Sequence, residues 1–452
     1  MFSERTNWKL AQNRLTEAIA QVRASGKTIL NLTASNPTRI GLKYDAAAIL
    51  GAFRSPKSLD YDPQAKGLLS AREAVSDYYR ADHDVEVDPE RIVLTTSTSE
   101  GYSFVFRLLC NTGDELLVPK PSYPLFEFLA DLQDVKLVPY PLIYDHGWQM
   151  DFHSLERAAT ARTRGVVVVH PNNPTGSFVS EEEREQLNAF CRERGLAVVV
   201  DEVFLDYGMK DAAAFPGLAK AARPFDKLSA GSGASHSVEP LQNSGSLYAT
   251  LDRHAPIQRL GRDDNALRDQ DDNAFGSFAG NDEVLTFTLS GLSKIAALPQ
   301  MKVAWVVTSG PEEIVREAMA RLEVIADTYL SMNAPVQWAI PVMLEQRKDI
   351  QRQLMARVRA NLSELDRQLS GQKACERLEV EGGWYAVLRV PVTRSDEELA
   401  IELVRERQVL VHPGHFYDFP SDGYLVVSLI GEEGEFASGV QRVLRDLNQV
   451  LD

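Results

Sequence analysis

The chain has 452 residues, of which 44% are hydrophobic and 25% charged, as in ordinary globular proteins. Its formal net charge of −16 argues against non-specific binding to nucleic acids or to anionic membranes, so any anionic ligand needs a local site. This length is large for a single hydrophobic core, and we therefore expect two domains.

The N-terminal segment MFSERTNWKLAQNRL carries charges and has no apolar core, so it does not resemble a signal peptide. No apolar run approaches the length of a membrane span. Helical spacing predicts one amphipathic helix from Leu10, Leu15, Ile19 and Val22. The three cysteines, Cys110, Cys191 and Cys375, are far apart and belong to no metal-binding pattern. We expect reduced thiols in a cytoplasmic protein without a metal site.

Residues 45–310 alternate short β-rich runs with longer helical ones, which predicts an α/β domain. The unalternating runs Val166–Val169 and Val198–Val200 favour strands buried on both faces, as in a parallel sheet covered by helices. Ser180 with Glu183 three residues later predicts a capped helix over Ser180–Arg194. The seven candidate strands are Ile92–Thr95, Glu115–Val118, Lys136–Tyr140, Gly165–His170, Ala197–Asp201, Leu285–Leu289 and Val303–Thr308.

After residue 310 the pattern changes to that of a smaller α+β domain, residues 311–452. A helical stretch over Pro311–Leu369 is interrupted near Asn333–Pro335. Two strands, Val380–Val390 and Tyr424–Leu429, and a helix from about Glu435 follow. We expect residues 1–44 to form a helix and an arm that join this small domain.

Residues 209–274 are rich in Gly, Ser, Asp, Asn and Arg and weakly periodic. So long a polar segment inside a compact domain is typical of an insertion, a lid or disorder. We favour a surface insertion over an active-site lid.

Lys294 ends the sequence Ser-Gly-Leu-Ser-Lys, directly after a predicted buried strand. A lysine at a strand end often extends its charge to solvent along an apolar surface. The same position suits a lysine that forms a Schiff base with a carbonyl cofactor.

Two further strands end in polar residues. Asp201 closes one strand, and the turn His170–Gly176, which contains Asn173, follows the strand before it. Because the carboxyl ends of parallel strands meet at one edge of a sheet, these residues are expected near each other. Taken alone, Asp201 is equally compatible with a helix cap and His170–Gly176 with an ordinary turn.

The segment Thr95–Gly101 follows a strand and opens a helical run, so its backbone N–H groups and hydroxyls suit a phosphate. A plain helix cap remains the alternative. Tyr123 suits stacking on a flat ring as well as a place in the core. Tyr61, before a Pro and a Gly, reads by itself as a turn residue.

In this order, the NNPTG, DEV and SGLSK elements resemble the fold-type I pyridoxal-phosphate (PLP) aminotransferases of class I/II. The resemblance covers nearly the whole chain apart from the insertion, and implies a large domain with a mostly parallel seven-stranded sheet. It implies a homodimer with shared active sites, in which Lys294 carries the Schiff base. Cofactor contacts would come from Asp201 at the ring nitrogen, Asn173 at the phenolic oxygen, Tyr123 on the ring, Thr98, Ser99 and Lys302 at the phosphate, and Tyr61 from the neighbouring subunit. Ser35 falls in the loop that passes the substrate.

The chain departs from the family pattern at several positions. Lys302 stands where an arginine usually clamps the phosphate, so the charge is kept and the bidentate fork lost. Phe204 replaces a tyrosine that donates to the phenolic oxygen, and Gly291 replaces a hydroxyl residue. The strand expected to supply an arginine for the substrate carboxylate has Val426 instead. Arg39 is our candidate replacement, with a plain surface arginine as the alternative.

These features predict an aminotransferase that moves an amino group from a donor to a 2-oxo acid by a ping-pong reaction through Lys294. The unusual Phe204 and Val426 leave two alternatives open, because fold does not fix function. One is a PLP-dependent lyase, such as a C–S lyase, and the other is a catalytically quiet PLP-binding protein.

Overall fold

We describe a computed structural model of the chain, which covers residues 1–8, 13–124, 126–209, 276–330 and 332–449. Leu10 and the predicted insertion, apart from Met209, lie outside the described residues. Among the described residues, no helix combines the length and apolar character needed to span a bilayer.

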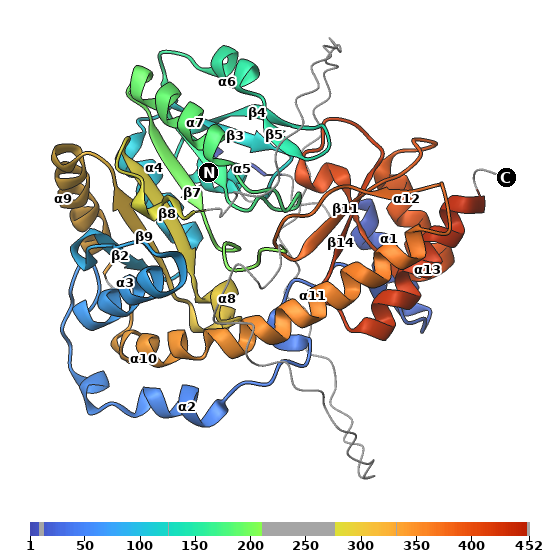
Figure 1. Cartoon of the computed structure of the whole chain (residues 1–452), viewed down its shortest axis with the longest axis horizontal. Coiled ribbons are helices and arrows are strands. Elements are labelled where there is room, and N and C mark those ends of the chain that lie inside the picture. Colours follow the sequence, from blue (N-terminus) through green and yellow to red (C-terminus); the bar gives the residue numbers. More distant parts are fainter. Residues whose placement is uncertain (9–12, 125, 210–275, 331, 450–452) are drawn as a thin grey trace.

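An eight-stranded sheet forms the centre of the larger half of the molecule (Figure 1). In spatial order its strands are β2 (Ile92–Thr95), β9 (Ala304–Ser309), β8 (Thr286–Gly291), β7 (Ala197–Asp201), β6 (Thr163–Val169), β3 (Glu115–Lys120), β4 (Lys136–Tyr144) and β5 (Trp148–Met150). The strands from β8 to β4 run parallel, and β9 is antiparallel to both of its neighbours. The predicted α/β class and mostly parallel sheet are confirmed.

The sheet has one strand more than the seven expected. The extra strand, β5, has three residues and pairs antiparallel with the end of β4. A strand this short shows too little alternation between polar and apolar residues to be recognised from sequence.

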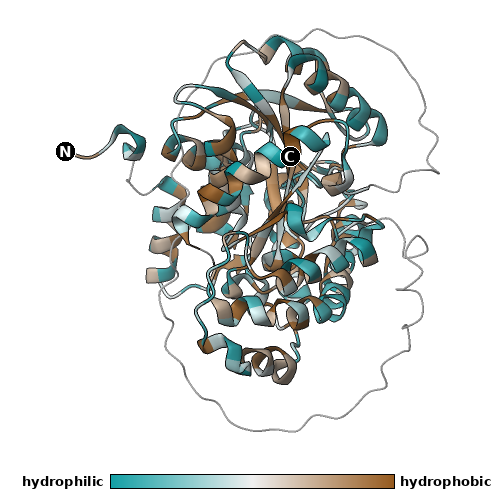
Figure 2. Cartoon of the chain, turned by 90° about the vertical axis from the view of Figure 1, so that its left-hand side faces the viewer, coloured by the Kyte–Doolittle hydropathy of each residue, from teal (hydrophilic) through white to brown (hydrophobic). Residues whose placement is uncertain are grey.

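Helices cover both faces of the large sheet, as the apolar strands predict. Val167 and Val199 point into a core shared with α4, α5 and α9, whereas Val166 and Val198 pack in a core with α6 and α7. Figure 2 shows the strands as mostly brown, hydrophobic ribbons behind helices with teal outer faces. The helices of this half are α2 (Ala46–Gly51), α3 (Leu69–His83), α4 (Thr98–Leu109), α5 (Phe126–Leu132), α6 (Phe152–Ala158), α7 (Glu181–Arg194), α8 (Leu292–Ile295), α9 (Glu312–Tyr329) and α10 (Ala334–Glu345).

The capping box predicted for α7 is confirmed. The Ser180 Oγ accepts a hydrogen bond from the Glu183 N–H at 3.2 Å, and the Glu183 carboxylate accepts the Ser180 N–H at 2.9 Å. The expected interruption near Asn333 is also present, because Asn333 caps α10 by accepting the Val336 N–H at 3.1 Å. Capping satisfies N–H groups that the first helical turn leaves without partners.

The smaller half is built on a four-stranded antiparallel sheet, with α11 (Arg347–Leu369) running to it from the large half (Figure 1). Its strands are, in order, β10 (Glu376–Arg377), β11 (Tyr385–Arg389), β14 (Tyr424–Ser428) and β13 (His412–Pro413). Helices α12 (Asp396–Glu402) and α13 (Glu433–Gln449) and a π-helical turn (Leu403–Arg407) complete it.

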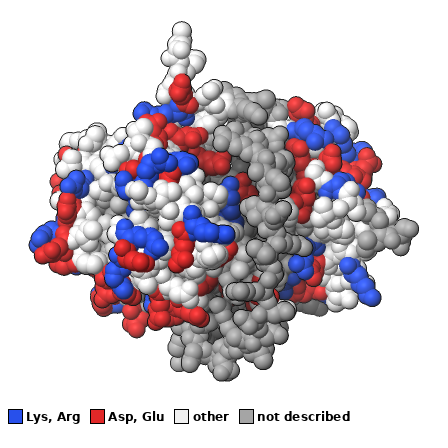
Figure 3. Space-filling view, turned by 90° about the horizontal axis from the view of Figure 1, so that it is seen from above, with Lys and Arg blue, Asp and Glu red and all other residues white. Residues whose placement is uncertain are grey.

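The N-terminal segment contacts both halves. Arg5 and Trp8 donate hydrogen bonds to Asp134 at 2.7 Å and to Asp131 at 3.0 Å, beside α5 of the large half, whereas α1 (Arg14–Ala24) packs on the smaller half. Helix α1 contacts α12, and Leu15 and Val22 lie in the same core as β11 and β14. Strand β1 (Leu30–Asn31) pairs parallel with β12 (Val409–Leu410). Acidic and basic side chains are interspersed over the described surface seen in Figure 3.

Candidate active site

Three neighbouring strands of the large sheet end at the same edge. Val169 of β6 is paired with Asp201 of β7, and Asp201 is paired with Leu289 of β8. The turns that follow these strands therefore begin side by side, and they contain Asn173, the residues after Asp201, and Lys294. This carboxyl edge is where open α/β sheets bind ligands.

Lys294 lies in the short helix α8, and its Nζ has no hydrogen-bond or ion-pair partner among the described residues. The Nζ faces aromatic rings instead, 4.9 Å from the centroid of Trp384 and 5.5 Å from that of Phe204. Burial lowers the pKa of Lys294 to about 8, against the opposing charge of Asp201. A lysine with this pKa is partly neutral near neutral pH, so its nitrogen can act as a nucleophile and accept a proton.

Asp201 is buried at the end of β7. Burial raises its pKa to about 6, against hydrogen bonds from the Val203 N–H at 3.1 Å and the Tyr102 hydroxyl at 3.2 Å. The charge of Lys294 also opposes the rise, but the two groups form no ion pair. Burial therefore disfavours the ionised form of Asp201, and a cationic ring nitrogen beside it would favour that form.

Asn173 carries a buried Oδ1 with no hydrogen-bond partner among the described residues. Its neighbour Asn172 is fully engaged. The Asn172 Nδ2 donates to Pro121 O at 3.1 Å and to Thr175 Oγ1 at 2.8 Å, and its Oδ1 accepts from Ser122 at 3.1 Å. Asn172 therefore fixes the turn and leaves the Asn173 amide for a ligand. Buried polar atoms without a partner are rare in native proteins and call for such an explanation.

The N-terminus of α4 forms an anion cradle. Ser97 caps the helix by accepting the Glu100 N–H at 3.2 Å, which leaves the N–H groups of Thr98 and Ser99 without helical acceptors. These groups and the positive end of the helix dipole suit a phosphate. Thr95 pairs with Ala304, which also pairs with Gly291, so the cradle begins beside the end of β8.

Lys302 stands two residues before Ala304, exposed and with a left-handed backbone (φ 55°). Tyr123 is half-buried after β3, with its ring edge-on to Phe126 at 6.3 Å. Tyr123 follows the carboxyl end of β3, and Lys302 precedes β9, whose first residue pairs with the last residue of β8, so both lie on the side of the sheet that carries Lys294.

The remaining predicted residues, Tyr61, Ser35 and Arg39, lie in other segments of the chain. Tyr61 is 84% exposed and makes no hydrogen bond, ion pair or ring contact within the described chain. Ser35 and Arg39 are exposed in the loop after β1. The Ala34 carbonyl accepts a hydrogen bond from the Ser428 hydroxyl at 2.5 Å, which holds that loop against the end of β14.

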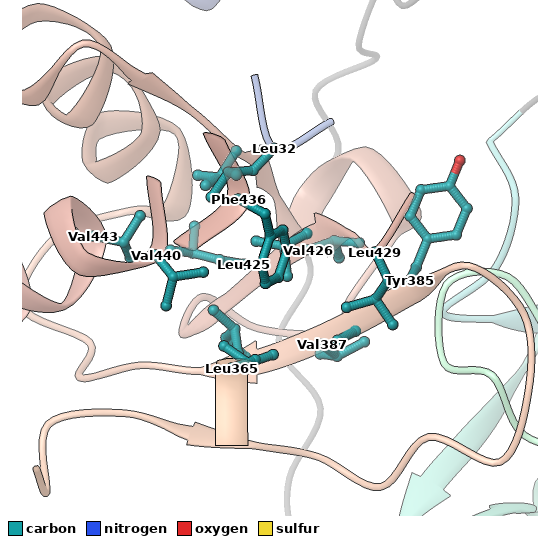
Figure 4. Close-up of a cluster of buried hydrophobic side chains, with 14 of the residues drawn as sticks. Leu32, Leu365, Tyr385, Val387, Leu425, Val426, Leu429, Phe436, Val440 and Val443 are labelled. Atoms are coloured by element: carbon teal, nitrogen blue, oxygen red, sulfur yellow. The ribbon is translucent and has the colours of Figure 1, made fainter. Parts of the chain in front are cut away.

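Strand β14 offers no cation for a substrate carboxylate, because Tyr424–Ser428 contains no arginine or lysine. Val426 is fully buried in the core of the small half. Figure 4 shows it among Leu32, Leu425, Leu429 and Phe436.

Three residues near the site were not predicted from sequence. Tyr102 donates to Asp201, the Tyr207 hydroxyl donates to the Lys294 carbonyl at 2.6 Å, and Trp384 faces the Lys294 Nζ. Tyr102 lies one helical turn after Ser99 on α4, so the sequence could have predicted that it lies on the same face of that helix as Ser99. Trp384 follows two glycines, which marks a tight turn but does not reveal its distant neighbour.

Together these residues fit PLP. The site offers a lysine of lowered pKa, a buried carboxylate, an amide without a partner and an anion cradle, around one sheet edge.

Comparison with known proteins agrees with this chemistry. The sequence profile of the family described as "Aminotransferase class I and II" matches residues 6–234, just over half of the chain. The chain belongs to this family. It is an aminotransferase, and its family depends on PLP.

Relatives extend the match beyond residue 234. Glutamate-pyruvate aminotransferase AlaA of Haemophilus influenzae is 24% identical over 436 residues, which cover 94% of this chain and 92% of that protein. An S-alkyl-thiohydroximate lyase of Arabidopsis thaliana is 32% identical over 157 residues, 35% of this chain and 34% of the lyase. The structure of an alanine aminotransferase from Pyrococcus furiosus matches with a TM-score of 0.79 and 18% identity, covering 99% of this chain and 100% of that one. The last match supports the fold alone.

Proposed function

We propose that this aminotransferase uses Lys294 as its catalytic lysine, and that two half-reactions move an amino group from an amino donor to a 2-oxo acid. The observation that carries the proposal is the environment of Lys294. Lys294 is half-buried, its Nζ has no polar partner among the described residues, and it follows a strand paired with the one that ends in Asp201. PLP, when bound, supplies the aldehyde that takes up the amino group and the ring that accepts electrons.

The roles of the other residues follow from their chemistry. Asp201, which is buried, would pair with the ring nitrogen and keep it protonated, and the Asn173 Nδ2 would donate a hydrogen bond to the ring's phenolic oxygen. Tyr123 stacks on the ring. The Thr98 and Ser99 N–H groups, the Ser99 hydroxyl and Lys302 bind the phosphate. Lys294 Nζ would hold the cofactor through its aldehyde, and as a free amine it would act as the base that takes the proton from the substrate carbon.

For the donor carboxylate we propose Arg39, with Ser35 lining the same loop. The support is that this loop lies against the end of β14 and that β14 itself has no cation. AlaA is named for glutamate and pyruvate, so these two compounds form the first donor and acceptor pair to assay.

We further propose a homodimer in which Tyr61 reaches the phosphate of the neighbouring subunit. Its high exposure within one chain supports this role. We propose a cytoplasmic location, a PLP domain at residues 45–310 with the insertion, and a small domain at 311–452 joined by residues 1–44. The strands of the large sheet all fall between residues 92 and 309, which supports a PLP domain in this region. Helices α9 and α10 also pack in cores of the large half, so the small domain proper begins nearer to α11 than to residue 311.

Replacing Lys294 tests the function. Lys294→Ala should remove the visible absorbance of bound PLP that depends on the lysine, and lower amino transfer at least about 10³-fold, because no other group replaces its nitrogen. Lys136→Ala is the control, since Lys136 is a surface lysine paired with Glu115. Wild-type protein that binds no PLP, or a Lys294→Ala variant with unchanged turnover, contradicts the proposal.

A lyase is the second candidate, supported by the partial match to a plant lyase and by the uncharged β14. The two activities differ in their need for an acceptor. A transferase needs a 2-oxo acid for repeated turnover, whereas a lyase releases ammonia or a thiol from the donor alone. Product release without an acceptor would therefore replace the transferase assignment.

A further inference from the structure

The turn that carries Lys294 is held by side chains from three distant parts of the chain. The Tyr207 hydroxyl donates to the carbonyl of Lys294 at 2.6 Å, and the Gln351 Nε2 donates to that of Ile295 at 3.0 Å. The Tyr44 hydroxyl donates to the carbonyl of Ala297 at 2.8 Å. Helix α8 has only four residues, so its carbonyls find few partners within the helix. The three donors therefore fix the lysine's backbone from outside.

Tyr207 also supports the other end of the lysine. Its ring is fully buried and packs edge-on against Trp384, with centroids 5.1 Å apart. The Trp384 ring lies 4.9 Å from the Lys294 Nζ. The Gly383 N–H donates to the Tyr207 carbonyl at 2.9 Å, which fixes the backbone beside Trp384. Tyr207 thus contacts the lysine's carbonyl directly and the lysine's nitrogen through one ring.

We propose that Tyr207 is a positioning residue for Lys294, holding its main chain by a hydrogen bond and its Nζ against Trp384, with Gln351 and Tyr44 fixing the rest of the turn. This inference rests on the proposed role of Lys294. Tyr207 touches no reacting atom and acts through the lysine. Positioning of this kind matters because displacement of a reacting group by about 1 Å can cost about 100-fold in rate.

The test uses Tyr207→Phe, which keeps the ring against Trp384 and removes only the hydroxyl. The Lys294 carbonyl keeps its bond from the Ala297 N–H, so the turn retains a partner in the variant. The matched control is Tyr140→Phe. Tyr140 is as deeply buried as Tyr207, and its hydroxyl also donates to a main-chain carbonyl, that of Val167 at 2.9 Å. Both Tyr140 and Val167 lie in the large sheet.

The first readout is the pH dependence of chemical modification of Lys294 in protein freed of PLP. An amine-reactive anhydride is used, and the lysine's peptide is followed by mass spectrometry. Without the Tyr207 hydroxyl, the Lys294 side chain gains access to water. The midpoint of the pH dependence of modification should therefore rise by at least about half a pH unit, towards that of an ordinary lysine. The second readout is kinetic, with kcat lowered about 10-fold or more and the donor KM little changed. Tyr140→Phe should leave both readouts at their wild-type values.

Equal behaviour of the two variants overturns the proposal, because a merely structural hydrogen bond would act alike at both sites. Gln351→Met, which keeps the side-chain length without the donor, should shift the Lys294 midpoint in the same direction and by less. It decides the question if Tyr207→Phe does not fold, and an unchanged midpoint then overturns the proposal. The modification experiment needs no turnover, so failure of this inference is distinct from failure of Lys294→Ala to abolish amino transfer.

Discussion

The carboxyl edge of the large sheet and strand β14 of the small sheet are both buried, yet they differ in what they leave unpaired. At the large sheet's edge, Asn173 Oδ1 and Lys294 Nζ have no polar partner among the described residues. Strand β14, where related enzymes led us to expect an arginine, has buried apolar side chains at Leu425, Val426 and Val427. The first region has the properties of a binding site, and the second those of a core.

This difference separates the two tasks of the enzyme. Buried polar groups without partners cost free energy, so a set of them on neighbouring strand ends indicates a ligand that pairs them. The groups that we propose for the cofactor, Asp201, Asn173 and Lys294, lie at or after the ends of strands that meet at that edge. Because β14 has no arginine or lysine, we propose that the cation for the donor carboxylate comes from another part of the chain.

The largest expected effect comes from placing a charge in β14. Val426→Arg should destabilise the protein by more than about 4 kcal/mol, because the guanidinium would be buried without a partner. Val392→Arg is the control, since Val392 is 67% exposed. Urea denaturation of both variants measures the difference. If Val426→Arg instead keeps wild-type stability and lowers the donor KM, position 426 faces the substrate, and β14 belongs to the binding site rather than to the core.

Glu202, the neighbour of Asp201, tests whether burial of a carboxyl group at the large sheet's edge lowers the free energy of unfolding. Burial raises the pKa of Glu202 from 4.5 to about 7, against hydrogen bonds from the Phe278 N–H and the Ser277 hydroxyl. The native state then keeps a proton that the unfolded state loses, so this group's contribution to stability falls as pH rises from about 4.5 to 7. Glu202→Gln should therefore gain up to about 3 kcal/mol relative to wild type across that window.

Denaturation of the cofactor-free protein at several pH values measures this gain. Glu185→Gln on α7 is the control, because it makes the same chemical change at an exposed position. A constant difference between Glu202→Gln and wild type would mean that Glu202 is ionised throughout. The edge would then be better solvated than its burial indicates.

Much of the fold was predictable because it depends on local patterns. The valine runs of β6 and β7 require burial on both faces, and Ser180 with Glu183 marks the start of α7. The short strand β5 was missed, since three residues carry almost no periodicity. The limits of the strands shifted by up to a few residues because ladder pairing, not composition, decides where a strand ends.

The site was predictable only where its residues follow strand ends. Asp201, Asn173 and Lys294 could be placed together because parallel strands end at one edge. Tyr207 and Trp384 lie far apart in sequence, and only tertiary packing joins them at Lys294. Val426 could be noted as an unusual residue in advance, but its burial in a core could not.

The smallest effect, and the one that decides where the donor carboxylate binds, is that of Arg39→Gln. Loss of a charge-assisted hydrogen bond should raise the KM for an amino acid donor about 10- to 100-fold while kcat changes less. Arg23→Gln, at an exposed arginine of α1, should leave KM unchanged. An amine without a carboxylate serves as a second control, because its binding should not depend on Arg39. If all donors respond equally, Arg39 supports the loop rather than the substrate, and the carboxylate is bound by a group outside both the N-terminal loop and β14.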